Sequence, residues 1–136
     1  MLRLDNESLE SYILNTMKPI QDLVNLEELY FMQNHSGSAE GVYIFSDEQG
    51  YHFVYSERGS ETRHKLTDNL FEITYWTIHE FVSSIAFEML KNNISMIENQ
   101  REYIFKQSLS LMEKIGPNFK KEEEIRIDEL IKENPY

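Results

Sequence analysis

The side chains best suited to acid–base or metal chemistry in this sequence are its four histidines: His35, His52, His64 and His79. His79-Glu80 begins like the helical zinc-protease motif, but Ser83 stands where that motif needs its second histidine. His52 lies between two aromatic residues in a predicted strand, which favours a place on a sheet face over metal binding. The chain has no cysteine, so disulfides and thiolate ligands are excluded. We therefore predict no metal site and no cofactor.

Residues for nucleophilic or phosphate chemistry are not arranged in any known pattern. Ser38, between Gly37 and Gly41, stands one place too early for a nucleophile elbow. The five glycines form no phosphate-binding loop. Acidic pairs such as Glu27-Glu28 are expected by chance among 24 acidic residues, and they indicate a solvated surface. We predict no catalytic residue. An unrecognised carboxylate enzyme stays as an alternative, which requires a deep polar pocket with shifted pKa values.

One charged segment, Glu57-Arg58-Gly59-Ser60-Glu61, combines a turn residue with ion-pair partners. Gly59 permits a tight turn, which brings Arg58 within reach of Glu57 or Glu61 for a bidentate pair. The plainer alternative is an exposed hairpin turn whose ion pair contributes about 0–1 kcal/mol.

The net charge of −11 is spread along the chain. Residues 1–66 carry 5 basic and 11 acidic side chains, and residues 67–136 carry 8 and 13, which gives −6 and −5. Such a field repels nucleic acid and anionic lipid and favours a basic partner, although solubility alone would also explain it. No signal-like apolar segment and no membrane-spanning run is present, so we expect a cytoplasmic protein.

The element expected to position the rest is a long helix at residues 70–90, with no glycine and no proline. Thr67, Asp68 and Asn69 offer caps at its start. A broad apolar face comprises Leu70, Phe71, Tyr75, Ile78, Phe81, Val82, Ile85, Ala86 and Met89. A second stripe comprises Ile73, Trp76 and Phe87. Two apolar stripes predict that a sheet covers one side of this helix and other helices cover the other.

Short strands are predicted before this helix. Asp5 or Asn6 caps a first helix, which Pro19 helps to end. Strands are expected at residues 29–33, 42–46, 51–57 and 61–66 because these segments are rich in β-branched and aromatic residues or alternate in polarity. Residues 47–50 form a four-residue hairpin signal between two of them.

Two further helices are predicted after residue 90. Ser95 and Glu98 suggest a capping box for a helix at residues 96–115, which Gly116-Pro117 ends. A last helix is expected at about residues 118–133. The whole order predicts one α+β domain over residues 1–136, with an N-terminal helix, a small antiparallel sheet of three to four strands, and three C-terminal helices packed on it.

From Tyr51 onward the sequence resembles a bacterial family known as immunity protein 63, whose members accompany polymorphic toxins used between competing bacteria. The resemblance covers roughly the last two-thirds of the chain, and the first 40 residues match loosely. Its residues are Tyr51-His52-Phe53, Glu57-Arg58-Gly59-Ser60-Glu61, Thr67-Asp68, Leu70 to Trp76, Phe105, Gln107-Ser108-Leu109, Leu111, Gly116-Pro117 and Phe119.

The resemblance implies a non-enzymatic protein that binds and neutralises a cognate toxin and has an α+β fold. A nuclease with a basic surface would suit the acidic charge. Exposed charges on loops at the sheet ends are the expected partner contacts: Glu40, Asp47, Glu48, Glu57, Arg58 and Glu61. Four motif residues are expected to be structural: Gly59, Asp68, Tyr75 and Trp76. The alternative function is a small acidic adaptor or structural protein with another partner.

Overall fold

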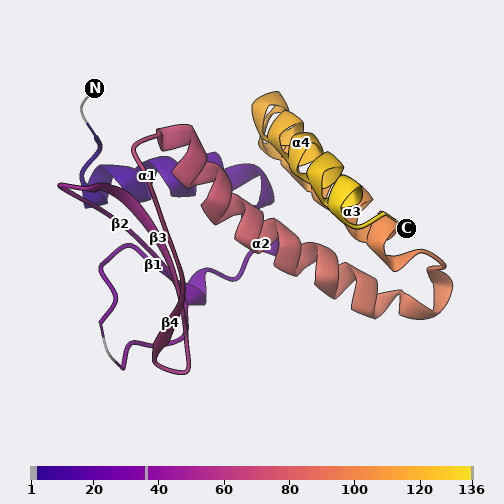
Figure 1. Cartoon of the computed structure of the whole chain (residues 1–136), viewed down its shortest axis with the longest axis horizontal. Helices are drawn as coiled ribbons and strands as arrows, with labels where there is room; N and C mark the ends of the chain where they lie inside the picture. The colour runs from indigo at the N-terminus through magenta and orange to yellow at the C-terminus, as the bar shows by residue number, and fades with distance from the viewer. Residues whose placement is uncertain (1–2, 36, 136) are drawn as a thin grey trace. The chain divides into compact units, whose positions relative to one another are not determined.

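The computed structural model describes residues 3–35 and 37–135 (Figure 1). The chain forms two compact units, which are described separately. Unit 1 comprises Met1–Thr16 and Asn25–Ile78, and unit 2 comprises Met17–Val24 and His79–Tyr136. The N-terminal helix, a four-stranded sheet and three C-terminal helices confirm the predicted α+β class. The expectation of one domain stays a prediction.

Unit 1 begins with helix α1, Asn6–Thr16. Asp5 caps it, because the Ser8 N–H donates to Asp5 Oδ1 at 2.8 Å. Asn6 has a different role: its Oδ1 accepts the Ser46 N–H at 2.6 Å and ties the helix to the sheet. Leu9 is fully buried. The helix therefore attaches to the sheet through one polar bond and its apolar side.

The sheet has the strand order β1 (Leu29–Tyr30), β2 (Gly41–Asp47), β3 (Gly50–Glu57) and β4 (Ser60–Thr67). β2, β3 and β4 pair antiparallel, as predicted. β1 pairs parallel with β2, so the expectation of a purely antiparallel sheet is wrong. The reason is the connection after β1. It leads back to the end of the sheet where β1 begins, so β2 starts there and runs in the same direction as β1.

Both hairpins of the sheet turn within two residues. Asp47 pairs with Gly50, so the predicted four-residue connection is a two-residue turn at Glu48 and Gln49. In the second hairpin Arg58 and Gly59 both take positive φ, 53° and 78°. Positive φ at both central residues gives the turn whose twist matches that of the flanking strands.

The sheet is covered on both faces within unit 1. We call the face of Val42, Ile44, Tyr51 and Phe53 the helix face, because the Leu4 N–H before α1 donates to the Tyr51 hydroxyl at 2.8 Å. The opposite face carries Tyr43, Phe45, His52 and Val54. We call it the loop face, because the Tyr43 hydroxyl donates to the Ala39 carbonyl at 2.7 Å in the connection before β2.

Helix α2, Leu70–Asn92, is continuous and confirms the predicted long helix. The Glu72 N–H donates to Asn69 Oδ1 at 2.9 Å, so Asn69 is the cap among the three candidates. The second apolar stripe is only partly buried: Ile73 is buried, Trp76 is half-buried, and Phe87 is 54% exposed. Within unit 1 the Lys65 ammonium lies 4.8 Å from the Trp76 ring centroid, so this ring borders the sheet rather than filling the core.

Unit 2 contains the later part of α2, the helices α3 (Gln100–Ile115) and α4 (Pro117–Glu133), and a 3₁₀ segment at Lys18–Leu23. The predicted start of α3 at residue 96 is wrong. Ser95 lies inside a 3₁₀ turn, Ile94–Met96, and Asn99 caps α3 by accepting the Glu102 N–H at 3.0 Å. Helices α3 and α4 pack against each other, and Leu111 and Met112 of α3 and Ile127 of α4 are buried.

We predict that Gly41→Ala destabilises the protein more than Gly37→Ala. Both glycines have positive φ, 146° and 83°, so alanine at either site is strained by about 1–3 kcal/mol. At Gly41 a Cβ would also lie 2.3 Å from the Glu28 carbonyl oxygen, whereas nothing lies within 4 Å at Gly37. Urea unfolding should show an additional loss of at least about 1 kcal/mol for Gly41→Ala. Equal losses would show that the backbone beside β1 shifts freely.

Candidate functional site

The predicted partner-binding residues lie at the two ends of the unit 1 sheet. Asp47 and Glu48 lie at the β2–β3 turn. Glu40 lies at the other end, because the next residue, Gly41, pairs with Ser56. Glu57 and Arg58 share that end, at the β3–β4 turn. All five carboxylate and guanidinium residues are exposed, so the loop positions expected for partner contacts are accessible.

Glu61 does not form the expected pair with Arg58. In the described part of the chain no ion pair joins Arg58 to Glu57 or Glu61. Glu61 Oε1 instead lies 2.6 Å from His64 Nδ1, and its Oε2 accepts from the Asn34 amide at 3.3 Å. The turn is therefore set by its backbone conformation, and Arg58 is left as an exposed positive charge beside Glu57.

Asp47 and Glu61 are joined by two histidines in a continuous hydrogen-bonded row. Asp47 Oδ1 lies 2.8 Å from His52 Nε2, and His52 Nδ1 lies 2.8 Å from His64 Nε2. The contact between His64 and Glu61 completes the row at 2.6 Å. We call Asp47, His52, His64 and Glu61 the histidine row. Two residues proposed separately from sequence thus belong to one arrangement.

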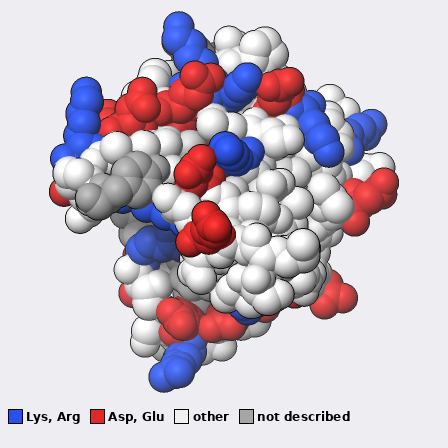
Figure 2. Space-filling view, turned by 90° about the vertical axis from the view of Figure 1, so that its right-hand side faces the viewer, with Lys and Arg blue, Asp and Glu red and all other residues white. Residues whose placement is uncertain are grey.

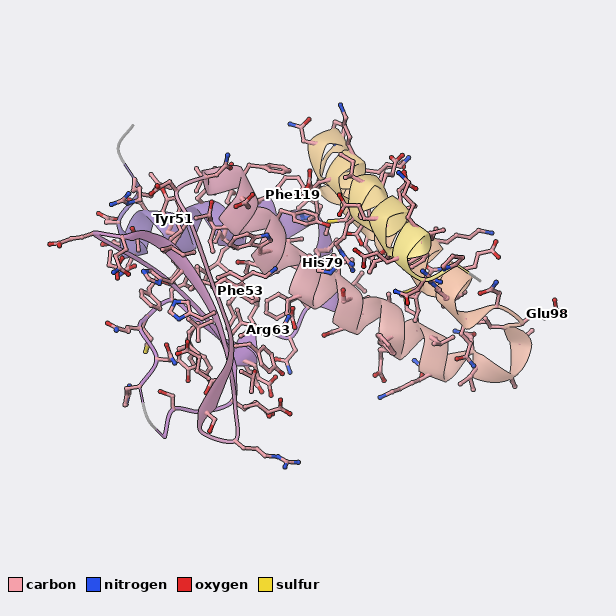
Figure 3. The ribbon with its side chains drawn as sticks, in the orientation of Figure 1. Tyr51, Phe53, Arg63, His79, Glu98 and Phe119 are labelled. Atoms are coloured by element: carbon pink, nitrogen blue, oxygen red, sulfur yellow. The ribbon has the colours of Figure 1, made fainter. Side chains whose placement is uncertain are left out.

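A β-bulge in β4 brings the row onto one face. Tyr55 pairs with Arg63 and Ser56 pairs with Glu61, so Thr62 is the extra residue. A bulge reverses the facing of every later residue relative to a regular hairpin. Val54 consequently pairs with His64, which places His64 on the loop face with His52. Arg63 is placed on the helix face, where its guanidinium lies 5.8 Å from the Phe53 ring centroid (Figure 3).

The row connects a buried imidazole to exposed carboxylates. The His52 side chain is 5% exposed and stacks on Phe45 with ring centroids 4.3 Å apart. Asp47, at 44%, and His64 and Glu61, both at 41%, are open to solvent. A buried imidazole needs a partner for each ring nitrogen, and the row supplies both. The same contacts fix two exposed acids in position.

The Asp47 end of the row favours the ionised carboxylate. The hydrogen bond from His52 is the main cause that lowers the pKa of Asp47, and the N–H of Gln49, which donates to Oδ1 at 2.9 Å, lowers it further. Desolvation acts in the opposite direction and is outweighed. Asp47 therefore stays negative to lower pH than an unpartnered aspartate.

The four motif residues expected to be structural all lie in unit 1. Gly59 occupies the β3–β4 turn. Asp68 pairs with Arg3 at 2.5 Å, just before α2. Tyr75 is buried and stacks on Phe71 with ring centroids 6.3 Å apart. With Trp76 beneath Lys65, these contacts surround the passage from β4 into α2. Their structural role stays a prediction.

A second hydrogen-bonded series lies in unit 2. Ser83 Oγ lies 3.2 Å from His79 Nε2, and His79 Nδ1 lies 3.0 Å from Glu123 Oε1. This order of serine, histidine and carboxylate is that of a hydrolase triad. Ser83, however, lies in the middle of α2, where its backbone N–H donates within the helix and cannot stabilise an oxyanion. We assign the series to the burial of Glu123, which is 1% exposed.

Sequence reasoning treated the histidines one by one and missed both series. In a regular hairpin around Arg58-Gly59, His64 would pair with Phe53 on the opposite face from His52. The extra residue Thr62 has no sequence signal strong enough to predict it. Among the described residues, no three histidine, aspartate or glutamate side chains are arranged to hold a metal ion.

Comparisons with known proteins give one match. The sequence model of the family described as immunity protein 63 matches residues 47–129. No curated protein and no solved structure matches the chain. The matched segment begins at Asp47, so it includes the whole histidine row, α2 and α3. In the part of the chain that the structure describes, no helix has the length and apolarity needed to cross a membrane.

We predict that Asp47→Asn flattens the acid-induced loss of stability. A carboxylate with a lowered pKa stabilises the fold fully above its unfolded pKa, about 3.9, and that stabilisation is lost as pH falls through the lowered folded value. Urea unfolding measures the free energy of unfolding at about pH 7 and pH 3, and the decrease between the two should be smaller for the variant than for wild type.

The matched control is Glu48→Gln, which removes the same charge from the neighbouring turn residue without touching His52. It should leave the pH profile close to that of wild type. Superimposable profiles for Asp47→Asn and wild type would show that the contact with His52 adds no stability.

Proposed function

Because the chain belongs to the immunity protein 63 family, we propose that it binds and neutralises a toxin made by the same bacterial cell. The observation that carries this proposal is the family match over residues 47–129, which includes β3, β4, α2 and α3. Neutralisation by binding needs no catalytic group in the inhibitor. The proposed site of action is the cytoplasm, and the proposed partner is a protein rather than a nucleic acid or a membrane.

The charge of the protein supports a basic toxin, such as a nuclease. The net charge is −11, and both halves of the sequence contribute to it. Acidic and basic side chains are interspersed around a broad uncharged area on the face drawn in Figure 2, so the acidic excess is not one concentrated patch there. A distributed excess acts at long range and raises the association rate with a partner of opposite charge.

The acidic residues at the ends of the unit 1 sheet are the proposed contacts. Strands of seven and eight residues at about 3.3 Å per residue place the two turns on the order of 20 Å apart. A standard interface of about 800 Å² per partner spans such a distance. One partner can therefore contact Asp47 and Glu48 at one end together with Glu40, Glu57 and Arg58 at the other. Glu61, held by His64, belongs to this second end, because it pairs with Ser56 beside the β3–β4 turn.

Co-expression tests the proposed function. The proposal predicts that a toxin domain is encoded beside this gene. That domain is produced in a sensitive host with and without the chain, and growth and complex formation are measured. Restored growth and a purified stoichiometric complex are expected. A control variant with a disrupted core, Ile44→Asp, should fail to rescue, because Ile44 is fully buried. Unchanged toxicity in the presence of folded wild-type protein would refute the proposal.

We predict that association with the toxin is electrostatically steered. The association rate should fall steeply between low and physiological salt, where the Debye length is about 8 Å, while the dissociation rate changes less. Reversal of Glu48 and Glu57 together to lysine should slow association without unfolding the protein, because both side chains are exposed and neither belongs to the histidine row. Stopped-flow mixing across a salt series measures both. A rate independent of salt would mean that the acidic charge serves solubility alone.

A further inference from the structure

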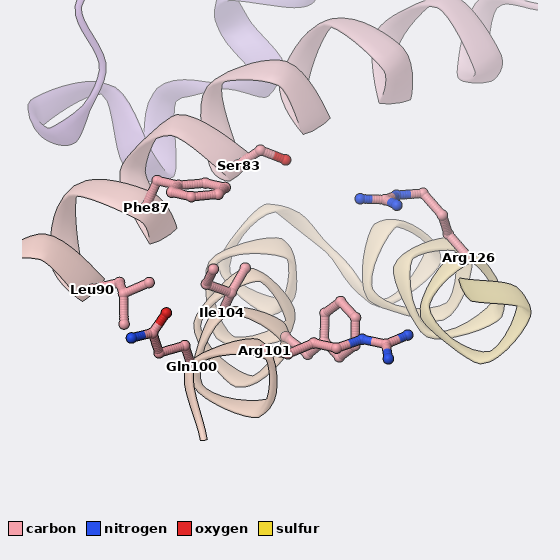
Figure 4. A pocket seen from close by; sticks show the side chains of 8 residues that line it. Ser83, Phe87, Leu90, Gln100, Arg101, Ile104 and Arg126 are labelled. Carbon is pink, nitrogen blue, oxygen red and sulfur yellow. The ribbon is translucent and has the colours of Figure 1, made fainter. Parts of the chain in front are cut away.

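Unit 2 contains a pocket of about 540 Å³ between α2, α3 and α4 (Figure 4). Its apolar walls are Phe87, Leu90, Ile104 and Phe105. Arg101 and Arg126 supply the charged part of its lining. A pocket of this size holds one large side chain together with a small polar group.

One apolar wall of the pocket is open to solvent, whereas Leu90 is buried. Phe87 is 54% exposed even though it is on the apolar second stripe of α2. Ile94 and Met96, which follow within ten residues, are 52% and 84% exposed. Three exposed apolar side chains in one short stretch indicate a contact surface for another protein rather than an ordinary solvated helix end.

Arg126 has an unsatisfied donor at this pocket. Its Nε is buried and has no hydrogen-bond partner among the described residues. Glu123 Oε1, which forms an ion pair with Arg126, lies 3.9 Å from Nε, beyond hydrogen-bond distance. The same oxygen lies 3.0 Å from His79 Nδ1. A buried donor without a partner is costly and uncommon in native proteins. Nε itself is too buried to be reached from outside, but the Arg126 side chain as a whole is 34% exposed, so the guanidinium group can meet an acceptor that a bound molecule brings.

Arg101, unlike Arg126 Nε, has hydrogen-bond acceptors within the protein. Its guanidinium donates to the carbonyls of Leu130 and Asn134 and lies 5.3 Å from the Phe105 ring centroid. These contacts hold it at the end of α4. Arg101 therefore contributes a fixed positive charge to the pocket, and Arg126 contributes a partly exposed guanidinium group.

We propose that this pocket receives a segment of the partner toxin in which an aromatic or large aliphatic side chain stands next to a carboxylate. The apolar side chain packs against Phe87 and Ile104, and the carboxylate accepts hydrogen bonds from Arg126. A planar guanidinium pairs with a carboxylate through two parallel bonds, which fixes the orientation of the segment. This inference rests on the proposed function and identifies an anchoring site for the same partner, separate from the acidic sheet ends.

The test compares the affinities of four proteins for the toxin domain encoded beside this gene, by titration calorimetry. Arg126→Gln removes the donor, and Phe87→Ser removes an exposed apolar wall without opening the core. Lys132→Gln, an exposed cation on α4, is the matched charge control. We expect Arg126→Gln and Phe87→Ser each to weaken binding at least about tenfold and Lys132→Gln to stay within about twofold of wild type.

Thermal unfolding shows whether Arg126→Gln stays folded beside the buried Glu123. If Arg126→Gln is unfolded, the affinity of Phe87→Ser alone tests the proposed pocket. Binding of Phe87→Ser and of any folded Arg126→Gln within about twofold of wild type would overturn this inference and leave the proposed function standing. A wild-type protein that does not bind the toxin would overturn both.

Discussion

Burial of β3 on both faces is the constraint on which the unit 1 architecture depends. Four consecutive residues, Tyr51 to Val54, are each less than 5% exposed, although neighbouring side chains on a strand point in opposite directions. One cover is not enough for such a strand. α1 and the start of α2 cover the helix face, and the connection between β1 and β2 covers the loop face. The parallel pairing of β1 follows from that connection.

This burial has a polar consequence, because one of the four residues is His52. An imidazole on the buried loop face must have partners for both nitrogens. The partners come from strand ends and from the bulged edge strand, so a requirement of the core fixes the orientation of two surface carboxylates, on Asp47 and Glu61. Glu123 in unit 2 follows the same rule, since its burial requires His79. Local packing therefore orients two surface carboxylates in unit 1 and one buried carboxylate in unit 2.

The extent to which sequence predicts this structure follows the strength of each local signal. The apolar periodicity of residues 70–90 is long and uninterrupted, and α2 has those limits to within two residues. The three hairpin strands were equally clear. The bulge at Thr62 was not predictable, because one extra residue changes no composition yet decides which face His64 occupies. The prediction of where α3 starts was wrong because Ser95 and Asn99 are both possible caps, and Asn99 is the one that accepts a helix N–H. Exposure of Phe87 depends on tertiary packing, which periodicity does not encode.

In the proposed complex, the acidic surface and the arginine pocket have separate roles. Distributed charge acts over about a Debye length and chiefly determines how fast partners meet. A guanidinium group in a pocket acts only at hydrogen-bond distance and chiefly determines how long they stay together. An acidic protein that bound through charge alone would accept many basic partners. The proposed pocket, in which Arg101 and Arg126 favour a carboxylate beside an apolar group, disfavours partners that are merely basic, because their cations would face two guanidinium groups. In this proposal acidic side chains attract the partner at long range, and arginine side chains discriminate between partners at contact.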